Sequence, residues 1–419
     1  MDRLKMRKLK LFLTILFIIL LQHQCNLEPG NRSESRNIGN INDIDALISE
    51  NLEFAQSRIT YFLEHLDVNT YPGSIDDDGQ LKTVPAKSWE AGCLAGILWK
   101  LYDYTRDEKW KVFAQQWTDG LELQKFNKNS HDLLFMLFTS FGNGHKLTDD
   151  ALYKDVLIVG SKSLATRYDP GIGLIKSWDK FYESQQIQFP VIIDALLANE
   201  MLFYAARISG DSNLYRIAYN HALNTKRDFF RTDYSSYYLV EYDTILNSVI
   251  AKKTWLGQAD ESTWARGHAR AIYGSALTFK ETGDSSFLEL AEKTAGFYMD
   301  HPRLPEDLIP YWDFDDPDIP NAPRDASAAC IAASGLLELA SLLPAGEQPK
   351  YADFAIRTLE SLASSGYRNK LNENPGFILK HSTGSRSWNI DVDKPKISAD
   401  YYFVEALVKL DKLKNNLVF

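Results

Sequence analysis

Two aspartates lie in apolar stretches of the sequence, where a charged side chain contributes nothing to packing. Asp132 follows Ser130, which suits a helix N-cap, so the positive end of that helix is expected to keep its carboxylate ionised. Asp194 lies in the apolar segment 189–197, where Pro190 suits the first helical position. Burial without a neighbouring cation raises the pKa of a carboxyl group, so Asp194 is expected to hold a proton near neutral pH. This pair predicts a general acid with an ionised companion.

Each aspartate also has a purely structural interpretation. Asp132 can be a helix cap, because acidic residues are common in the first turn of helices. Asp194 can be a buried residue whose carboxylate holds a neighbouring loop. Both interpretations stay open on these two stretches alone.

Aromatic and cationic residues accompany the two aspartates. Aromatic faces in a polar cleft bind sugar rings, although any single one can equally be a core residue. Arg266 is expected to clamp a carboxylate or a sulfate, with an ion-paired structural arginine as the alternative. The candidate substrate-binding residues at this point are Trp89, Trp178, Trp264, His131, Arg266, His268 and Arg270.

The elements that must position these residues are almost all helical. Strand signals are few and short, the best being Tyr237–Tyr242 and Gly376–Lys380, so the pattern predicts an all-α fold. Twelve segments have helical periodicity: 42–66, 89–105, 107–125, 131–141, 149–168, 189–209, 211–229, 262–282, 284–301, 324–342, 348–366 and 397–413.

Short joints separate several of these helices. Residues 105–107, 209–211 and 282–284 each connect two periodic segments, and such joints are typical of antiparallel helix pairs. Six helical hairpins in succession can close into an (α/α)6 barrel, and an open solenoid is the alternative. The longer loops are expected to gather on one face and to carry the function. No linker divides the chain, so residues 42–419 are predicted to form a single catalytic domain.

The composition is that of an acidic globular protein. The chain has 419 residues, of which 45% are hydrophobic, and a formal net charge of −10, which disfavours nucleic acid as a partner. Cys93 and Cys330 lie in apolar helical segments, and no Cys and His spacing resembles a metal site. We therefore expect neither a disulfide framework nor a metal.

The first 25 residues have the pattern of a signal peptide. Five basic residues precede an apolar run that is too short to span a membrane, and residues 26–41 form a polar leader. Cys25 stands where a bacterial lipoprotein is acylated, although Gln24 replaces the small residue expected before it. Export to the periplasm or cell surface is predicted, with membrane attachment only through a lipid on Cys25. The oligomeric state stays open.

Several stretches together resemble the unsaturated glucuronyl hydrolases of glycoside hydrolase family 88, to which the unsaturated rhamnogalacturonyl hydrolases of family 105 are related. The resemblance extends from about Trp89 to Leu407. The stretches that carry it are 130–133, 177–179, 189–194, 260–267, 309–314, 324–329 and 399–403.

The resemblance implies a fold and a reaction. Family members have an (α/α)6 barrel and remove the 4,5-unsaturated uronic acid that polysaccharide lyases leave at the non-reducing end of oligosaccharides. The position matching Asp194 would protonate C4 of the vinyl ether before water adds at C5, and the position matching Asp132 would assist. Neither a metal nor an organic cofactor is implied. An anionic unsaturated oligosaccharide is thus the expected partner.

The sequence departs from the family pattern around the substrate. Tyr238 stands where a His is common and is therefore counted among the substrate-binding residues; His268 replaces a Gln and Arg270 replaces a Trp. Trp255 and Leu256 replace a His-Gln pair. These changes predict a remodelled pocket in which Arg270 is a candidate for a sulfate or an extra carboxylate. Fragments of glycosaminoglycans and of a sulfated algal polysaccharide such as ulvan both fit.

Three alternatives remain from the sequence. An unsaturated rhamnogalacturonyl-type hydrolase could use the same barrel. An ordinary inverting hydrolase or a sugar epimerase could also use it, although the motifs lack a convincing distant carboxylate pair or paired catalytic His. A non-catalytic carbohydrate-binding protein could also have kept the barrel. Retention of both Asp132 and Asp194 argues against that, because binding an anionic sugar does not require two acids.

Overall fold

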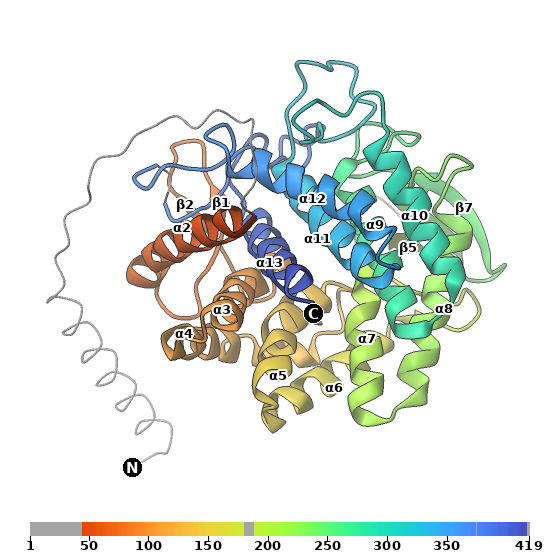
Figure 1. The fold of residues 1–419 in the computed structure, drawn as a ribbon. Helices are drawn as coiled ribbons and strands as arrows, with labels where there is room; N and C mark the ends of the chain where they lie inside the picture. Colours follow the sequence, from red (N-terminus) through yellow and green to blue (C-terminus); the bar gives the residue numbers. More distant parts are fainter. Residues whose placement is uncertain (1–43, 180–187, 374, 417–419) are drawn as a thin grey trace, which may run out of the picture. The chain divides into compact units, whose positions relative to one another are not determined.

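A computed structural model describes residues 44–179, 188–373 and 375–416 (Figure 1). The described residues form one compact unit. The predicted signal peptide 1–25, the leader 26–41 and Cys25 lie outside the described residues.

Six helices of the described chain form a closed inner ring. They are α3 (Gly92–Thr105), the π-helix η3 (Leu134–Gly142), α7 (Ala195–Ser209), α9 (Ala265–Thr282), α11 (Ala326–Leu342) and α13 (Ile397–Lys414). Each contacts the next in this order, and α13 contacts α3 again. This closure excludes the open solenoid and confirms the (α/α)6 barrel.

An outer helix covers each inner one. In the same ring order the outer helices are α4 (Glu108–Asp119), α6 (Ala151–Ala165), α8 (Ser212–Asp228), α10 (Ser285–Met299), α12 (Gln348–Ala363) and α2 (Ile44–His65). Figure 1 shows one such hairpin, α7 and α8, in light green. The short helix α5 (Asn143–Thr148) continues η3, and short turns form at Trp89–Ala91 (η1) and Glu122–Phe126 (η2). All twelve predicted helical segments contain a helix.

The short joints end and begin helices as their residue types predict. Gly210 and Gly283 adopt the left-handed conformation, with φ of 73° and 69°, that glycine reaches without steric cost. Asp211 accepts a hydrogen bond from the Asn213 amide at 3.0 Å and so caps α8. Asp284 caps α10 in the same way. The left-handed glycines and the capping aspartates end one helix and start the next, and so produce the antiparallel helix pairs.

Short antiparallel strands line the loops of the barrel. The largest sheet has three, β5 (Phe189–Ile192), β6 (Leu239–Asp243) and β7 (Ser248–Lys253), and two-stranded pairs join β1 (Tyr71–Ile75) with β2 (Leu81–Val84) and β3 (Tyr168–Asp169) with β4 (Leu174–Ile175). The strand predicted at 237–242 is present as β6. The strand predicted at 376–380 is wrong, because that segment makes only an isolated bridge between Leu379 and Arg368.

One helix begins later than the sequence predicts. The segment 189–192 is strand β5, so Pro190 pairs with Glu241 of β6 instead of starting α7. All four residues of β5 are buried, which a strand covered on both faces achieves without helical periodicity. Asp194 therefore stands at the N-cap of α7 and not one turn inside it.

Glycine allows the start of α3 to lie directly against η3. A Cβ atom on Gly92 would lie 2.2 Å from the Phe135 carbonyl oxygen, closer than any side chain tolerates. This contact holds the N-terminal ends of two inner helices together beside Asp132. The thiols of Cys93 and Cys330 are buried and free.

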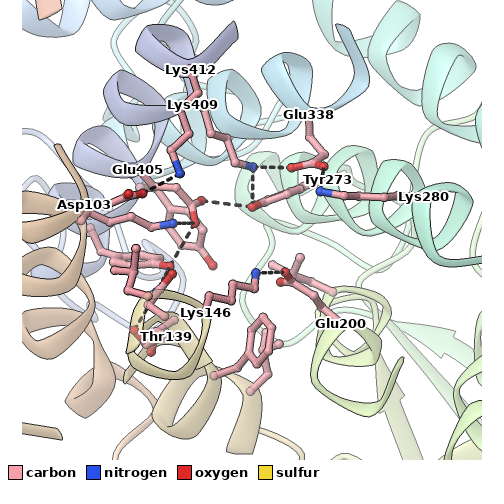
Figure 2. Close-up of a pocket in the computed structure, with 18 residues that line it drawn as sticks. Asp103, Thr139, Lys146, Glu200, Tyr273, Lys280, Glu338, Glu405, Lys409 and Lys412 are labelled. Atoms are coloured by element: carbon pink, nitrogen blue, oxygen red, sulfur yellow. Dashed lines mark hydrogen bonds and ion pairs between the residues drawn. The ribbon is translucent and has the colours of Figure 1, made fainter. Parts of the chain in front are cut away.

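A network of paired charges lies inside the barrel, mostly on the middle and C-terminal turns of the inner helices. We call it the far-end ion cluster; it consists of Lys100, Asp103, Lys146, Glu200, Lys280, Glu338, Glu405, Lys409 and Lys412 and lines a cavity of about 280 Å³ (Figure 2). Glu338 bonds Lys280 and Lys409, each at 2.8 Å, and Lys412 bonds Asp103 at 2.6 Å. Every member of the cluster has an ion-pair partner within it.

Candidate active site

The predicted site residues gather where the inner helices begin, opposite the far-end ion cluster. Trp89 precedes α3, Asp132 precedes η3, and Asp194 occupies the N-cap position of α7 without a capping hydrogen bond from its side chain. Arg270 lies in the second turn of α9. The N-terminal ends of the inner helices thus bring together residues that are far apart in the sequence.

Asp132 is held by its neighbours and stays partly open to solvent, with 21% of its side chain exposed. The Ser130 hydroxyl donates to the Asp132 carboxylate at 2.6 Å and accepts from the Asp132 amide at 3.0 Å. His131 Nε2 lies 3.3 Å from the other carboxylate oxygen of Asp132. These contacts fix the orientation of the carboxylate.

Residue 177 connects the segment of Asp132 to the segment of Asp194. The amide of His131 donates to the Ser177 carbonyl at 3.2 Å, and the amide of Ser177 donates to the Pro190 carbonyl at 2.8 Å. The Ile192 amide donates to the Ser177 hydroxyl at 3.0 Å. The two aspartates therefore sit on one hydrogen-bonded framework.

His131 is a neutral imidazole at physiological pH. Its ring is buried, and burial lowers the pKa of His131 to about 4 despite the opposing effect of Asp132. The ring of Trp178 packs edge-on against it, with 5.4 Å between ring centroids. His131 and Trp178 thus form one wall beside Asp132.

Asp194 has a cationic partner that the sequence pattern did not reveal. Its side chain is buried, with 3% exposed, and it forms an ion pair with Nη1 of Arg270. The expectation of a buried acid without a cation is therefore wrong. The reason is tertiary: the neighbours of Asp194 on α7 are apolar, but α9 packs against α7 and carries Arg270 to it.

Aromatic rings surround Arg270. Its guanidinium carbon lies 5.3 Å from the ring centroid of Trp89 and 4.8 Å from that of Phe135. Arg270 also interacts electrostatically with Asp132. Arg270 thus pairs with Asp194 and also feels the charge of Asp132.

Tyr238 forms another wall. The Tyr238 carbonyl accepts from the Ile193 amide at 3.0 Å, which places the tyrosine directly beside Asp194. Burial and the charge of Asp132 raise the pKa of the Tyr238 hydroxyl, so it remains a neutral donor. Trp264 packs edge-on behind Tyr238, with 5.2 Å between ring centroids.

Arg266 serves the fold, as in the ion-paired alternative. Its Nη1 donates to Asp325 at 3.0 Å and to the Thr383 carbonyl at 3.0 Å, and its Nη2 donates to the Gly384 carbonyl at 2.9 Å. These bonds hold the N-terminus of α11 and a loop, so the prediction of a free carboxylate or sulfate clamp is wrong.

His268 also differs from its predicted role. It is fully buried and points away from Arg270 toward the outer helix α10, where its Nε2 lies 2.9 Å from the Thr294 carbonyl. Its Nδ1 lies 3.2 Å from the Ser236 hydroxyl. Residues two apart on a helix face opposite directions, which is why Arg270 and His268 do not share a site.

The sequence does not reveal that Trp255 and Trp388 form a pair. Trp255 and Trp388 stack with 4.2 Å between ring centroids, and Trp388 is 49% exposed. The Trp388 indole donates to the Trp255 carbonyl at 2.7 Å. The replaced His-Gln pair marked position 255, but nothing in the sequence pattern paired it with a residue 133 positions later.

The described part of the chain contains no group of three or more metal-ligating side chains. Within the same residues, no helix is long and apolar enough to cross a membrane.

A buried carboxylate next to an arginine, inside a closed helical barrel with aromatic walls, suits acid–base chemistry on an anionic sugar. A scan against models of known protein families gives no match. The chain is 40% identical over 99% of its length to an unsaturated glucuronyl hydrolase of Formosa agariphila, which it covers completely. It is 33% identical, over 77% of its length and 86% of the relative's, to an unsaturated glucuronyl hydrolase of Bacillus sp. strain GL1.

Solved structures agree. A crystal structure of an unsaturated glucuronyl hydrolase specific for heparin superposes with a TM-score of 0.85 and 37% identity, covering 88% of this chain and 98% of that one. An aspartate-to-asparagine variant of the enzyme from Streptococcus agalactiae, in complex with dGlcA-GalNAc6S, gives a TM-score of 0.72 at 25% identity, covering 90% of this chain and 98% of the other. The fold is that of a class of glycosidases. The chain belongs to the unsaturated glucuronyl hydrolases.

Proposed function

We propose that this glycosidase removes a 4,5-unsaturated uronic acid from the non-reducing end of oligosaccharides that polysaccharide lyases release. The observation that carries the proposal is the position of Asp194, buried beside Arg270 and joined through Ser177 to the segment of Asp132. A member of this family needs a proton donor in a site that also receives an anionic sugar.

In the proposed reaction, protonated Asp194 gives its proton to C4 of the vinyl ether. Positive charge develops at C5, water adds there, and the Asp194 carboxylate takes the proton that the water loses. The product is a hemiketal, which opens and releases the rest of the oligosaccharide from C1. Each turnover therefore consumes one water and leaves Asp194 as it began.

Asp132 has the supporting role in this mechanism. Its carboxylate is oriented by Ser130 and His131 and is partly exposed, so it faces the sugar without being the buried acid. A fixed negative group stabilises the positive charge that develops on the ring during protonation. The neutral imidazole of His131 can bond a sugar hydroxyl, and Trp178, Trp89 and Tyr238 offer ring surfaces to the sugar.

Two substrate classes are proposed. The relatives include the structure described as specific for heparin and hydrolases described as acting on unsaturated chondroitin disaccharides. Unsaturated disaccharides from glycosaminoglycans are therefore the first substrates to test, and fragments of a sulfated algal polysaccharide such as ulvan are the second.

The experiment follows the double bond directly. The conjugated uronate absorbs ultraviolet light, and hydration abolishes the absorbance. The protein is incubated with lyase digests of chondroitin, heparin, hyaluronan and ulvan, and the rate of absorbance loss ranks the substrates. Absence of any loss with all four digests would contradict the proposed function.

We also propose that the protein is exported, on the basis of residues 1–25. The mass of the mature chain purified from membrane and soluble fractions tests this. An N-terminus beyond residue 25 in the soluble fraction supports a cleaved signal peptide, and a lipid mass on Cys25 supports an anchor. A cytoplasmic chain that retains Met1 would contradict export.

A further inference from the structure

Arg270 has donors that the described residues do not use. Its side chain is 5% exposed, and Nη1 bonds Asp194. Nε and Nη2 are buried and have no hydrogen-bond partner among the described residues. Buried guanidinium donors are nearly always satisfied, and their planar arrangement matches the two oxygens of a carboxylate. The unused donors therefore point to a ligand.

The proposed reaction places a carboxylate at this position. A general acid must come within about 3 Å of the atom it protonates, which here is C4. The carboxylate carbon of the unsaturated uronate is two bonds from C4, through C5, at a distance of about 2.5 Å. A guanidinium in contact with the acid is therefore within reach of the sugar's own carboxylate.

The resting ion pair also conflicts with the role of Asp194. A carboxylate paired with a buried arginine is held in its ionised form and has no proton to give. The second oxygen of Asp194, Oδ2, is buried without a partner among the described residues. If Arg270 left, nothing described would replace it, and a buried unpaired carboxyl binds a proton.

We propose, on the basis of the function proposed above, that the substrate's carboxylate replaces Asp194 on Arg270 and that Asp194 takes up one proton from solvent as a result. That proton then goes to C4. Water that adds at C5 returns a proton to Asp194, and the proton leaves for solvent when the product departs and Arg270 pairs with Asp194 again. Only the correct anionic sugar thus creates the acid.

The other groups that face Arg270 do not compete for this role. Asp325, from the N-terminus of α11, is bonded to Arg266. Cys93 on α3 and Tyr402 on α13 are buried, and burial raises the pKa of both, so they carry no charge. Asp132, before η3, acts on Arg270 electrostatically and is bonded to Ser130. Asp194 is the partner that must exchange.

The first test combines an enzyme change with a substrate change. Wild type and Arg270→Met are each assayed with the unsaturated uronide and with its methyl ester, which removes the negative charge. We expect Arg270→Met to lower kcat/KM for the acid by about 100-fold and not to lower it for the ester, because Asp194 without Arg270 already holds a proton. Arg270→Lys, which keeps a cation, is expected to recover part of the loss.

The matched control is Arg266→Met, a second buried arginine on the same helix. It is expected to lower stability and to leave the acid-to-ester ratio at the wild-type value. An unchanged ratio in active Arg270→Met would overturn the proposal. A loss confined to sulfated substrates would also overturn it, because Arg270 would then bind sulfate.

The second test measures the proton. A disaccharide with a saturated, non-reducing glucuronate binds without reacting, and calorimetry at pH 6 in two buffers of different ionisation enthalpy counts the protons taken up. Wild type is expected to take up close to one, and Asp194→Asn none. Zero uptake by wild type would overturn the exchange. Because no hydrolysis is needed, this result is independent of whether the enzyme cleaves unsaturated uronides.

Discussion

The far-end ion cluster and the Asp194–Arg270 pair treat buried charge in opposite ways. In the far-end ion cluster every charged residue has a partner, and Glu338 has two lysines at 2.8 Å each. Where the inner helices begin, Asp194 and Arg270 share one ion pair and leave Asp194 Oδ2 and two guanidinium nitrogens without partners in the described structure. The inner helices α7 and α9 contribute to both groups, with Glu200 and Lys280 in the cluster and Asp194 and Arg270 in the pair.

This difference in pairing predicts different effects of mutation at the cluster and at the Asp194–Arg270 pair. Paired buried charges are satisfied by the protein alone, and removing one partner leaves the other uncompensated. Unpaired polar atoms are satisfied only when a ligand arrives. We therefore expect changes at the far end to lower stability and changes at the site to lower turnover.

The largest effect is expected from Asp194→Asn. The amide cannot donate and accept a proton in turn, so kcat should fall by about 10²- to 10⁴-fold, as loss of general acid–base catalysis does. The absorbance assay measures it. Asp179→Asn is the control, since the Asp179 side chain is 56% exposed and pairs with Arg167 at 3.2 Å. An Asp194→Asn enzyme with the wild-type rate would remove Asp194 from the mechanism.

Glu338→Gln is the corresponding change at the far end. It leaves Lys280 and Lys409 without their carboxylate, so the free energy of unfolding should fall by about 3–5 kcal/mol, while kcat/KM of the folded enzyme stays unchanged. Denaturant unfolding and the absorbance assay measure the two. Glu261→Gln, at a side chain that is 77% exposed and pairs with Arg231 at 3.5 Å, should change stability by less than about 0.5 kcal/mol. If Glu338→Gln slowed turnover at full stability, the division between the two ends would be wrong.

Acid should weaken the far end through Glu405. Its lysine neighbours, Lys409 and Lys100, outweigh burial and lower the pKa of Glu405 to about 2 from 4.5. A lowered carboxyl pKa stabilises the folded state fully above pH 4.5 and loses that contribution as pH falls toward 2.

Glu405→Gln tests this dependence. Its cost in unfolding free energy, on the order of 3 kcal/mol near pH 7, should shrink as the pH is lowered from 4.5. Denaturant midpoints at several pH values measure it. The wild type should already lose stability between pH 6.5 and 4, because burial lowers the pKa of His131 and His268 to about 4. A cost of Glu405→Gln that did not change with pH would contradict the lowered pKa.

The smallest effect on catalysis is expected at His268. Since its two nitrogens contact Ser236 and Thr294 inside the protein, His268→Asn should lower the free energy of unfolding by about 1–3 kcal/mol and leave KM and kcat at wild-type values. His131→Asn is the comparison. Because His131 lies beside Asp132, this substitution should raise KM. A higher KM for His268→Asn at unchanged stability would show that His268 binds the substrate.

Local sequence signals predicted the parts of this fold that depend on local contacts. Asp211 and Asp284 cap their helices and Gly210 and Gly283 end the preceding ones, because these interactions span only a few residues. The start of α7 was mispredicted, because the burial of β5 depends on β6, whose residues lie about 50 positions later. Hydrophobic periodicity depends only on residues close in sequence, so it cannot show that β5 pairs with β6.

The sequence by itself determined the twelve helical segments, the short joints, and the two aspartates with the family that they resemble, whereas closure of the ring was decided by the structure. Only the tertiary structure decided that Arg270 pairs with Asp194, that Arg266 pairs with Asp325, and that His268 faces the outer helices. The physical reason is that a side chain's charge and burial depend on the helix packed against it. On α9, residues 268 and 270 are two positions apart and face opposite directions, so His268 contacts the outer helix while Arg270 pairs with Asp194.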